Sequence, residues 1–314
     1  MVVWVVIASF HNDEDVAEIL NEVHGCRLKV TDKILVIDSE GTQAIPKLIT
    51  DQGWQDVIYK SYDENLGSGA NLSERLRIAA EGGADYAYAL NHDGHFDEGV
   101  LAALIEAVAN VQDLGAAYPL GYLNLAGAYN LTGTRELPLP AKLVHSRPKK
   151  QMLDVFWSSS NGALYSMEPV RSGILPWGAM WMGWEDLEYG WRLCSSGYRQ
   201  VIVCDAVYVD NYEYRKAWFG RTVDKQAWRT YYFSRNLLMA IRRNRNRVIY
   251  YAVASYRFFR ELCLIWLARD CKWERTRFLL KGVIDGLRTD VECPHEAEHG
   301  EPHRKQTSPR SVES

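Results

Sequence analysis

Buried-strand patterns and helix patterns alternate over the first 120 residues, and this alternation limits the fold more than any other feature. The strand patterns cover residues 2–8, 33–38, 56–60, 85–90 and 116–120. The helix patterns cover residues 13–24, 45–52, 72–81 and 100–111. Such alternation implies right-handed crossovers between parallel strands. The sequence therefore predicts an α/β fold whose mostly parallel sheet is flanked by helices.

The pattern changes twice further along the chain. Residues 124–150 are rich in Gly, Pro and Leu and have little periodicity, which indicates an insertion near the binding face. Three elements are then expected: a strand, a helix that Gly197 ends, and a second strand, at 156–166, 185–196 and 199–209. From residue 228 onward the pattern is helical, with helices expected at 231–243, 248–268 and 273–287. These changes predict a main unit over 1–227 with halves 1–123 and 124–227, a helical region over 228–290, and a disordered tail over 291–314.

Composition is that of an ordinary globular protein, with 47% hydrophobic and 24% charged residues, which is enough for a large core. The six cysteines show no metal-binding spacing. The first strand lacks a basic leader, so no signal peptide is expected and the thiols should be free in a reducing cytoplasm.

Positive charge is concentrated near the C-terminus. Residues 242–288 hold twelve Lys/Arg and four Asp/Glu, which leaves the rest of this chain of net charge −4 strongly acidic. Either these helices face an anionic partner, or they present a solvated face. No nucleic-acid motif accompanies them, which favours a membrane or lipid phosphate. The uncharged run 248–256 is too short to span a bilayer, which needs about 20 apolar residues. It suits a helix in the membrane interface, or a helical cover over the core.

Acidic residues stand at three places that a parallel sheet would bring to one crevice. Asp38 and Asp93 follow strand patterns, and Glu185–Asp186 opens a helix. Asp93 would suit Mg²⁺ or Mn²⁺ on a ligand's phosphates, or a turn. Asp38 would suit a base or ribose, or again a turn, and Ser9 and Phe10 would border the same crevice.

Two further stretches carry chemistry. The segment 64–71, with Asn65, Gly67 and Asn71, allows close backbone approach before a helix N-terminus that can hold an anion; a plain turn also explains it. Small residues at 158–162 likewise leave room for a ligand.

The pair Glu185–Asp186 lies where a helix favours ionised carboxylates, while desolvation raises their pKa. This combination suits a general base acting on a hydroxyl, or a pair that only stabilises its own helix. The nearby Trp177, Trp181 and Trp184 suit a platform for a sugar ring, or core packing.

In this order the segments resemble family-two glycosyltransferases of the GT-A fold. The matching segments are 3–11, 35–39, 65–71, 90–93, 184–198 and 231–236. Asn91 and Asp93 stand where that family has its DxD or NxD metal motif, and Asp186 stands where it has its catalytic base. The last segment is similar to one in the rhamnosyltransferase-like and galactofuranosyltransferase-like branches. The chain departs from the family pattern in offering one metal carboxylate, Asp93, and in having residues 209–212 where a His is common.

The resemblance implies an inverting, metal-dependent enzyme with dTDP-rhamnose as favoured donor, then UDP-galactofuranose or another UDP-hexose. The half 1–123 would hold the nucleotide-sugar and the half 124–227 the acceptor. The acceptor would be a cell-envelope glycan, or one linked to a polyprenyl diphosphate. The enzyme would lie in the cytoplasm, peripheral on the inner face of the membrane; a homodimer is left open.

Each candidate residue has an expected role. The donor would contact eight residues: Ser9, Phe10, Asp38, Asn65, Gly67, Asn71, Asn91 and Arg235. Asp93 would bind Mg²⁺ or Mn²⁺, Asp186 would act as base, and Glu185 would position it or the acceptor. The acceptor side would be lined by Trp177, Trp181 and Trp184.

Two alternatives remain open. A nucleotidyltransferase would release pyrophosphate, and the N-terminal Gly-rich signature with Arg and Lys that usually accompanies it is absent. A non-catalytic glycan- or lipid-binding protein with a degenerate GT-A fold would explain the single metal carboxylate and the missing His.

Overall fold

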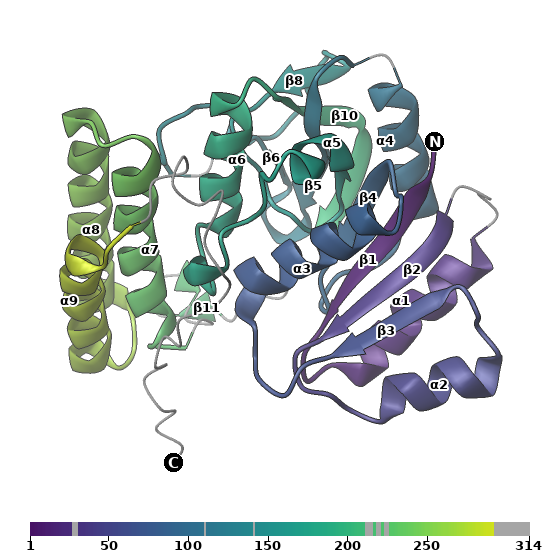
Figure 1. Ribbon diagram of the computed structural model, residues 1–314. Helices are drawn as coiled ribbons and strands as arrows, with labels where there is room; N and C mark the ends of the chain where they lie inside the picture. Colours follow the sequence, from purple (N-terminus) through teal and green to yellow (C-terminus); the bar gives the residue numbers. More distant parts are fainter. Residues whose placement is uncertain are drawn as a thin grey trace.

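A mixed sheet with helices on both faces forms the main part of the molecule (Figure 1). The computed structural model describes residues 1–26, 31–109, 111–140, 142–210, 216–217, 221–222 and 226–291. Within this part of the chain, ten strands form the large sheet: β1 (Val3–Ser9), β2 (Thr31–Asp38), β3 (Val57–Ser61), β4 (Tyr86–Leu90), β5 (Leu114–Leu123), β6 (Ala128–Asn130), β7 (Leu143–Val144), β8 (Met152–Asp154), β9 (Ala163–Ser166) and β10 (Arg199–Asp210). A separate two-stranded ribbon pairs β11 (Lys216–Ala217) with β12 (Arg221–Thr222).

The order of the strands is β3-β2-β1-β4-β9-β5-β10-β8, with β6 and β7 beside β5. The pairs β1–β2, β1–β4, β2–β3 and β5–β10 are parallel, while β9 runs antiparallel to both of its neighbours. The register places Ser9 beside Asp38 and Ile7 beside Leu90. The carboxyl ends of the first strands therefore meet at one edge, as the alternating pattern predicts.

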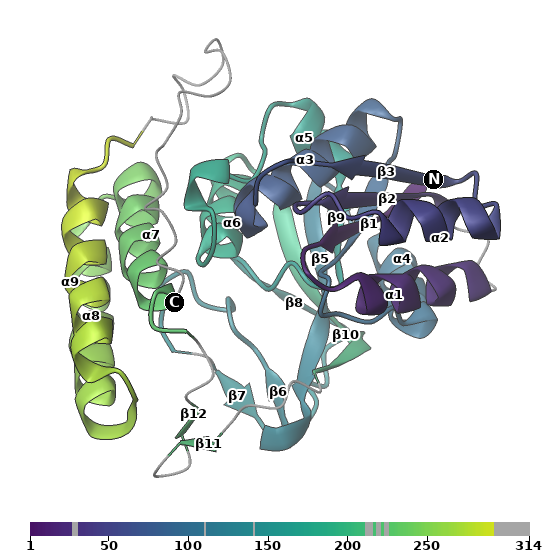
Figure 2. The ribbon, with the colours of Figure 1, turned by 90° about the horizontal axis from the view of Figure 1, so that it is seen from below.

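Nine α-helices occur in the described ranges: α1 (Asp13–Gly25), α2 (Ala44–Gln52), α3 (Gly67–Glu81), α4 (Glu98–Val108), α5 (Met167–Arg171), α6 (Glu185–Ser195), α7 (Arg229–Asn244), α8 (Val248–Ala268) and α9 (Lys272–Arg288). Two 3₁₀ turns are η1 (Asn124–Ala126) and η2 (Gly178–Met180). Helices α1 and α4 cover one face of the sheet, and α3 and α5 cover the other (Figure 2).

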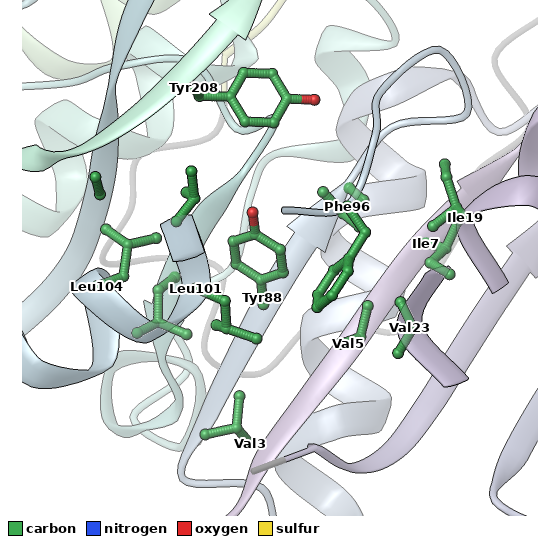
Figure 3. Packing of buried hydrophobic residues seen from close by; sticks show 14 of the residues in the cluster. Val3, Val5, Ile7, Ile19, Val23, Tyr88, Phe96, Leu101, Leu104 and Tyr208 are labelled. Carbon is green, nitrogen blue, oxygen red and sulfur yellow. The ribbon is translucent and has the colours of Figure 1, made fainter. Parts of the chain in front are cut away.

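Alternation along β1 explains the two layers. Val3, Val5 and Ile7 belong to the cluster on the α1 and α4 side. Figure 3 shows Val5 and Ile7 near Val23 and Ile19 of α1. Trp4 and Val6 belong instead to the cluster under α3. Both sets are 2% exposed or less, so β1 is buried on both faces, as expected for a central parallel strand.

Helix α6 joins the sheet to the C-terminal helices. Its Tyr189 and Leu193 pack in the cluster on the sheet, while Leu187 and Trp191 pack against α7 and α8. Helices α7, α8 and α9 stand together beside α6 (Figure 1). Helix α9 fits closely on α7 because Gly282 and Gly286 touch its backbone, where any side chain would overlap α7.

Most predicted elements are confirmed within a few residues, and two predictions need correction. Helix α3 begins at Gly67, because the predicted glycine-containing loop forms its first turn. The strand predicted at 156–166 is limited to Ala163–Ser166, since the small residues before it take an irregular path. Within the predicted insertion 124–150, β6 and β7 extend the sheet.

Among the described residues, no helix is both long and apolar enough to cross a membrane. The five described cysteines are free thiols, as expected. The sixth cysteine and the predicted tail from 292 onward lie outside the described residues.

Candidate functional site

The first half of the crevice is built from the ends of β1 and β2 and from α3. Ser39 N–H donates to the Ser9 carbonyl over 3.0 Å, and Asn71 Nδ2 donates to the Ile37 carbonyl and Ser39 Oγ, each over 3.2 Å. Ser9 Oγ and Asn71 Oδ1 are buried, and neither finds a hydrogen-bond partner in the described part of the chain. Buried polar atoms are normally satisfied. These two predicted nucleotide contacts are thus brought together with free hydrogen-bonding capacity, while Phe10 is partly exposed beside them.

Asp38 lies at the same edge of the sheet, but its carboxylate is hydrogen-bonded to other groups of the chain itself. Its side chain is fully buried. The carboxylate accepts the backbone N–H groups of Glu40 and Thr42, each over 3.0 Å, and the Tyr59 hydroxyl over 2.5 Å. These bonds hold the turn after β2. Contact between Asp38 and a nucleoside stays a prediction.

The first turn of α3 is held against a tryptophan-containing loop. Asn65 Oδ1 accepts the Gly67 N–H over 2.9 Å, and the Trp181 indole donates to the Asn65 carbonyl over 3.2 Å. Gly67 has φ +69°, and a Cβ there would overlap Trp181. Both the backbone conformation and the packing therefore require glycine at this position.

Asp93 projects from a loop that long-range contacts pin in place. The backbone N–H of Asn91 donates to Asn161 Oδ1 over 3.0 Å, and Asn161 Nδ2 donates to the Tyr208 hydroxyl over 3.3 Å. The same hydroxyl accepts the His95 N–H over 3.0 Å. Asp93 itself is exposed, so its carboxylate is accessible from the crevice end of β4.

Asp186 is the most perturbed acid of the site. Its Oδ1 is sealed from solvent and has no hydrogen-bond partner among the described residues. Burial, and then the charge of Glu185, raise the pKa of Asp186 to about 8. The hydroxyl and backbone of Ser160 hydrogen-bond to the carboxyl and oppose this rise, as does the charge of Arg75. Since Ser160 precedes Asn161, one short segment contacts both Asp186 and the Asp93 loop.

Arg75 is a functional candidate that the sequence analysis missed. It is 2% exposed, and its Nη1 donates to the carbonyls of Val6 and Leu90, each over 2.9 Å. Burial lowers the pKa of Arg75 to about 10, and the charge of Asp186 opposes this change. A cation is therefore fixed beneath the crevice between β1 and β4. The signal was available, because position 75 lies among the buried positions Leu72, Leu76 and Ala79 of α3.

Glu185 contacts the opposite wall. The Ser68 hydroxyl of α3 donates to Glu185 Oε1, which ties the start of α6 to the start of α3. Ser68 Oγ also lies 3.2 Å from the Trp181 carbonyl oxygen. The two helix starts and the tryptophan loop therefore form one connected wall.

The three tryptophans are partly buried, and each packs toward the C-terminal helices. The Arg243 guanidinium lies 4.2 Å from the Trp177 ring centroid, and the Arg257 guanidinium lies 4.6 Å from that of Trp184. Trp181 packs against Tyr232 at 4.7 Å between ring centroids. Packing thus accounts for part of each ring, and contact with an acceptor sugar stays a prediction.

Arg235 and Asn236 brace the loop that precedes α6. Arg235 Nη2 donates to the Ala179 carbonyl over 3.0 Å. Asn236 is fully buried, and its Nδ2 donates to the Met182 carbonyl over 2.7 Å and the Gly183 carbonyl over 3.0 Å. Bracing by Arg235 is therefore present, while its predicted contact with the donor is untested.

No cluster of three or more His, Cys, Asp or Glu side chains is arranged to hold a metal ion among the described residues. Asp93 is the exposed carboxylate of the predicted metal motif, with Asn91 two residues before it. Of residues 209–212, where the family that the sequence resembles often has a His, residues 211 and 212 lie outside the described residues. Mg²⁺ and Mn²⁺ sites that use one or two carboxylates together with substrate phosphates fit this donor set.

Solved structures share this architecture, and the fold is that of GT-A glycosyltransferases. TarS residues 1–349 of S. aureus with UDP-GlcNAc align with TM-score 0.60 and 12% identity, over 92% of this chain and 81% of that one. The mannosyltransferase PcManGT of Pyrobaculum calidifontis with GDP-Man and Mn²⁺ aligns with TM-score 0.54 and 13% identity, over 92% and 76%.

GalNAc-T7 with UDP, GalNAc and Mn²⁺ aligns with TM-score 0.55 and 14% identity, over 77% of this chain. The chain spans about half of GalNAc-T7, 48% of its length. No protein-family model matches the sequence, and no curated protein matches it. These likenesses establish the shared fold, and the predicted rhamnosyl branch remains a prediction.

Proposed function

We propose that this protein is an inverting glycosyltransferase that uses a nucleotide-sugar donor. The observation that carries the proposal is the environment of Asp186: a carboxyl with one oxygen buried and unpartnered at the start of α6, beside the Ser160–Asn161 segment that holds the Asp93 loop. Strongly perturbed carboxyls in a crevice are typical of acid–base sites.

The reaction follows from this geometry. Asp186 accepts the proton of an acceptor hydroxyl, and the oxygen forms a bond to the anomeric carbon of the donor. The bond between that carbon and the diphosphate oxygen breaks on the opposite face, and the nucleoside diphosphate leaves with the electron pair. General base catalysis of this kind contributes typically ~10²–10⁴-fold. Glu185, held by Ser68, positions Asp186 or the acceptor.

The nucleotide-sugar would lie along the ends of β1, β2 and β4. The free polar atoms of Ser9 and Asn71 suit a base or ribose, while Asn65 and Gly67 shape the wall at the start of α3. Asn91 lies at the loop that would face the diphosphate, and buried Arg75 adds positive potential beneath it.

Asp93 would hold Mg²⁺ or Mn²⁺ together with the donor's diphosphate. A bound divalent ion would neutralise the charge that builds on the leaving diphosphate. The GDP-Man and UDP complexes of structurally similar proteins contain Mn²⁺, which supports this choice of ion.

We favour dTDP-rhamnose as donor, with UDP-galactofuranose or another UDP-hexose next, because of the segment 231–236. This segment braces the loop before α6, so its likeness to rhamnosyltransferase-like sequences concerns the site itself. Two structurally similar proteins were solved with GDP-Man and UDP-GlcNAc. Other hexose donors are therefore included in the experiment below.

The acceptor is proposed to be a lipid-linked or cell-envelope glycan met at a membrane surface. Helix α9 exposes Trp273, Leu280, Ile284 and Leu287 along one face, with basic residues along the edge of that face. An apolar face with basic edges suits the interface of an anionic membrane. Cosedimentation with anionic but not neutral vesicles would support this contact, and equal recovery with both would contradict it.

A thermal-shift panel tests the function directly. It compares dTDP-rhamnose, UDP-galactofuranose, UDP-glucose and GDP-mannose, each with and without Mn²⁺. A ligand at 100 times its dissociation constant stabilises the fold by about 2.7 kcal/mol, which is readily detected. Stabilisation by one donor only with Mn²⁺ supports the proposal, and no shift with any donor favours a degenerate GT-A protein that binds glycan or lipid.

The reaction products distinguish a glycosyltransferase from the remaining alternative, a nucleotidyltransferase. A glycosyltransferase releases a nucleoside diphosphate, whereas a nucleotidyltransferase releases pyrophosphate from a nucleoside triphosphate. Release of pyrophosphate would contradict the proposed function.

A further inference from the structure

A cavity of about 260 Å³ lies among α7, α8 and α9. Its charged lining consists of Arg229, Arg257, Arg260, Glu261 and Arg269. The volume is below the ~300–1,000 Å³ that is usual for drug-sized ligands. The cavity therefore suits a small group, not a whole nucleotide-sugar.

The lining is strongly cationic, with four guanidinium groups and one carboxylate. Arg269 uses that carboxylate, since its Nη1 lies 3.0 Å from Glu261 Oε1. Arg229, Arg257 and Arg260 form no ion pair with any carboxylate among the described residues. Three guanidinium groups that lack an ion-pair partner among the described residues match the charge of a phosphate or diphosphate, which arginine binds with charge-assisted hydrogen bonds.

Arg257 is partly buried and is held in place by two contacts. Its Nη1 donates to the Pro138 carbonyl over 2.8 Å, and its guanidinium covers the Trp184 ring. Burial, and then the charge of Arg260, lower the pKa of Arg257 to about 10. An anion in the cavity would relieve both effects, so the arrangement is electrostatically ready for one.

The cavity shares a wall with the candidate active site. Trp184 lines the cavity and directly precedes Glu185 and Asp186. Its indole donates to the Phe233 carbonyl of α7 over 2.8 Å. A group bound in the cavity would therefore be fixed close to the start of the helix that carries the proposed base.

An apolar surface begins at the rim of the same cavity. Phe259, next to Arg260, is 69% exposed, and Leu267 is 68% exposed further along α8. Trp266 contacts Trp273 at 4.9 Å between ring centroids, which links the exposed face of α8 to that of α9. A hydrocarbon chain attached to the bound phosphate could follow this face.

We propose that this cavity binds the phosphate or diphosphate group of a lipid-linked acceptor, whose chain follows the exposed apolar face of α8. The proposal rests on the glycosyltransferase function proposed above and names its acceptor class. Free phosphate has the same headgroup chemistry but no chain, and the exposed apolar face favours the lipid source.

Calorimetric titration of the full chain tests the site, with EDTA present to exclude metal-dependent binding in the crevice. The probes are geranyl diphosphate, inorganic pyrophosphate and geraniol. Geranyl diphosphate should bind most tightly, pyrophosphate more weakly, and geraniol not measurably. Equal affinity for geranyl diphosphate and pyrophosphate, or no binding of geranyl diphosphate, would overturn the lipid-linked assignment.

Variants locate the site. Arg257→Gln and Arg260→Gln should each weaken geranyl diphosphate about tenfold or more, since each loses a charge-assisted contact. Arg277→Gln is the matched control, because Arg277 is exposed on α9 and does not line the cavity. Arg260 is also exposed, so its variant keeps the test valid if Arg257→Gln lowers the melting temperature. Equal weakening by all three variants would reject the cavity as the site.

Binding of a nucleoside diphosphate with Mn²⁺ separates the two proposals. Arg260→Gln should leave that binding unchanged. A wild-type chain that binds the nucleotide but not geranyl diphosphate would refute the cavity site alone. A wild-type chain that binds geranyl diphosphate but no nucleotide would refute the proposed function and leave the cavity site standing.

Discussion

Asp38 at the end of β2 and Asp186 at the start of α6 are surrounded in opposite ways. The Asp38 carboxylate accepts two backbone N–H groups and the Tyr59 hydroxyl, all from neighbouring turns and strands. Asp186 keeps one oxygen buried without a partner, next to the second acid, Glu185. The Asp38 carboxylate is saturated with hydrogen bonds, whereas burial and the charge of Glu185 penalise an ionised Asp186.

The difference separates two uses of one residue type. A saturated carboxylate holds a loop in shape and has little capacity left for a ligand. An unsaturated one costs stability and is retained where a proton must be transferred. Substitutions at the two positions should therefore have opposite effects on activity and on stability.

The largest effect is expected for Asp186→Asn. Transfer should fall by about 10²–10⁴-fold, because the amide cannot accept the acceptor's proton. Initial rates of nucleoside diphosphate release measure this loss, with nucleotide binding in Mn²⁺ as the control for folding. A variant that keeps more than a tenth of the activity would remove Asp186 from the reaction.

Asp93→Asn should act through the metal. Loss of a residue that only supports a metal ligand typically weakens metal affinity ~10–100-fold. Loss of the ligand itself should therefore raise the Mn²⁺ concentration for half-maximal activity by at least that factor. A Mn²⁺ titration of transfer measures it. Asp205→Asn, another exposed acid, is the control and should leave the titration unchanged. An unchanged titration for Asp93→Asn would place the ion elsewhere.

Asp38→Asn should destabilise the fold by about 3 kcal/mol, since hydrogen bonds to a charged group are worth ~1.5–3 kcal/mol and an amide cannot accept all of them. Urea unfolding at pH 7 measures this loss. If stability is unchanged and only the Michaelis constant for the donor rises, the nucleoside role of Asp38 replaces the loop-holding one.

Asp186→Asn should stabilise the fold, and the gain should depend on pH. Folding raises the pKa of Asp186 from about 3.9 to about 8, so wild-type stability falls as pH rises between these values. At pH 7 the free energy of unfolding of the variant should be about 2 kcal/mol higher than that of the wild type. Each pKa unit corresponds to at most ~1.4 kcal/mol, and relaxation around a buried carboxyl keeps the gain below that maximum. Melting temperatures from pH 4 to pH 8 measure it, and a gain independent of pH would contradict the raised pKa.

Local patterns predict most of the fold because each element leaves its own periodicity in the chain. The apolar strands and the helix that Gly197 ends are examples, since their residues interact with near neighbours in sequence. The same locality explains why Glu185–Asp186 could be selected from sequence.

Residues that meet only in three dimensions could not be found in this way. Asn161 contacts Asn91 across 70 positions, and Tyr208 reaches His95 across 113. The small residues at 158–162 indicate room for a ligand, but nothing local in the sequence indicates that Ser160 contacts Asp186. The packing of the tryptophans against arginines of α7 and α8 also depends on tertiary contacts alone.

Helix α6 packs between two layers, with the sheet on one side and α7 and α8 on the other. A chain cut at residue 227 would uncover Leu187 and Trp191 and release the brace that Asn236 provides to the preceding loop. The helical region therefore helps to fix the orientation of the proposed base, Asp186. A displacement of these helices would act on Leu187, the residue directly after Asp186, because Leu187 packs against α7 and α8.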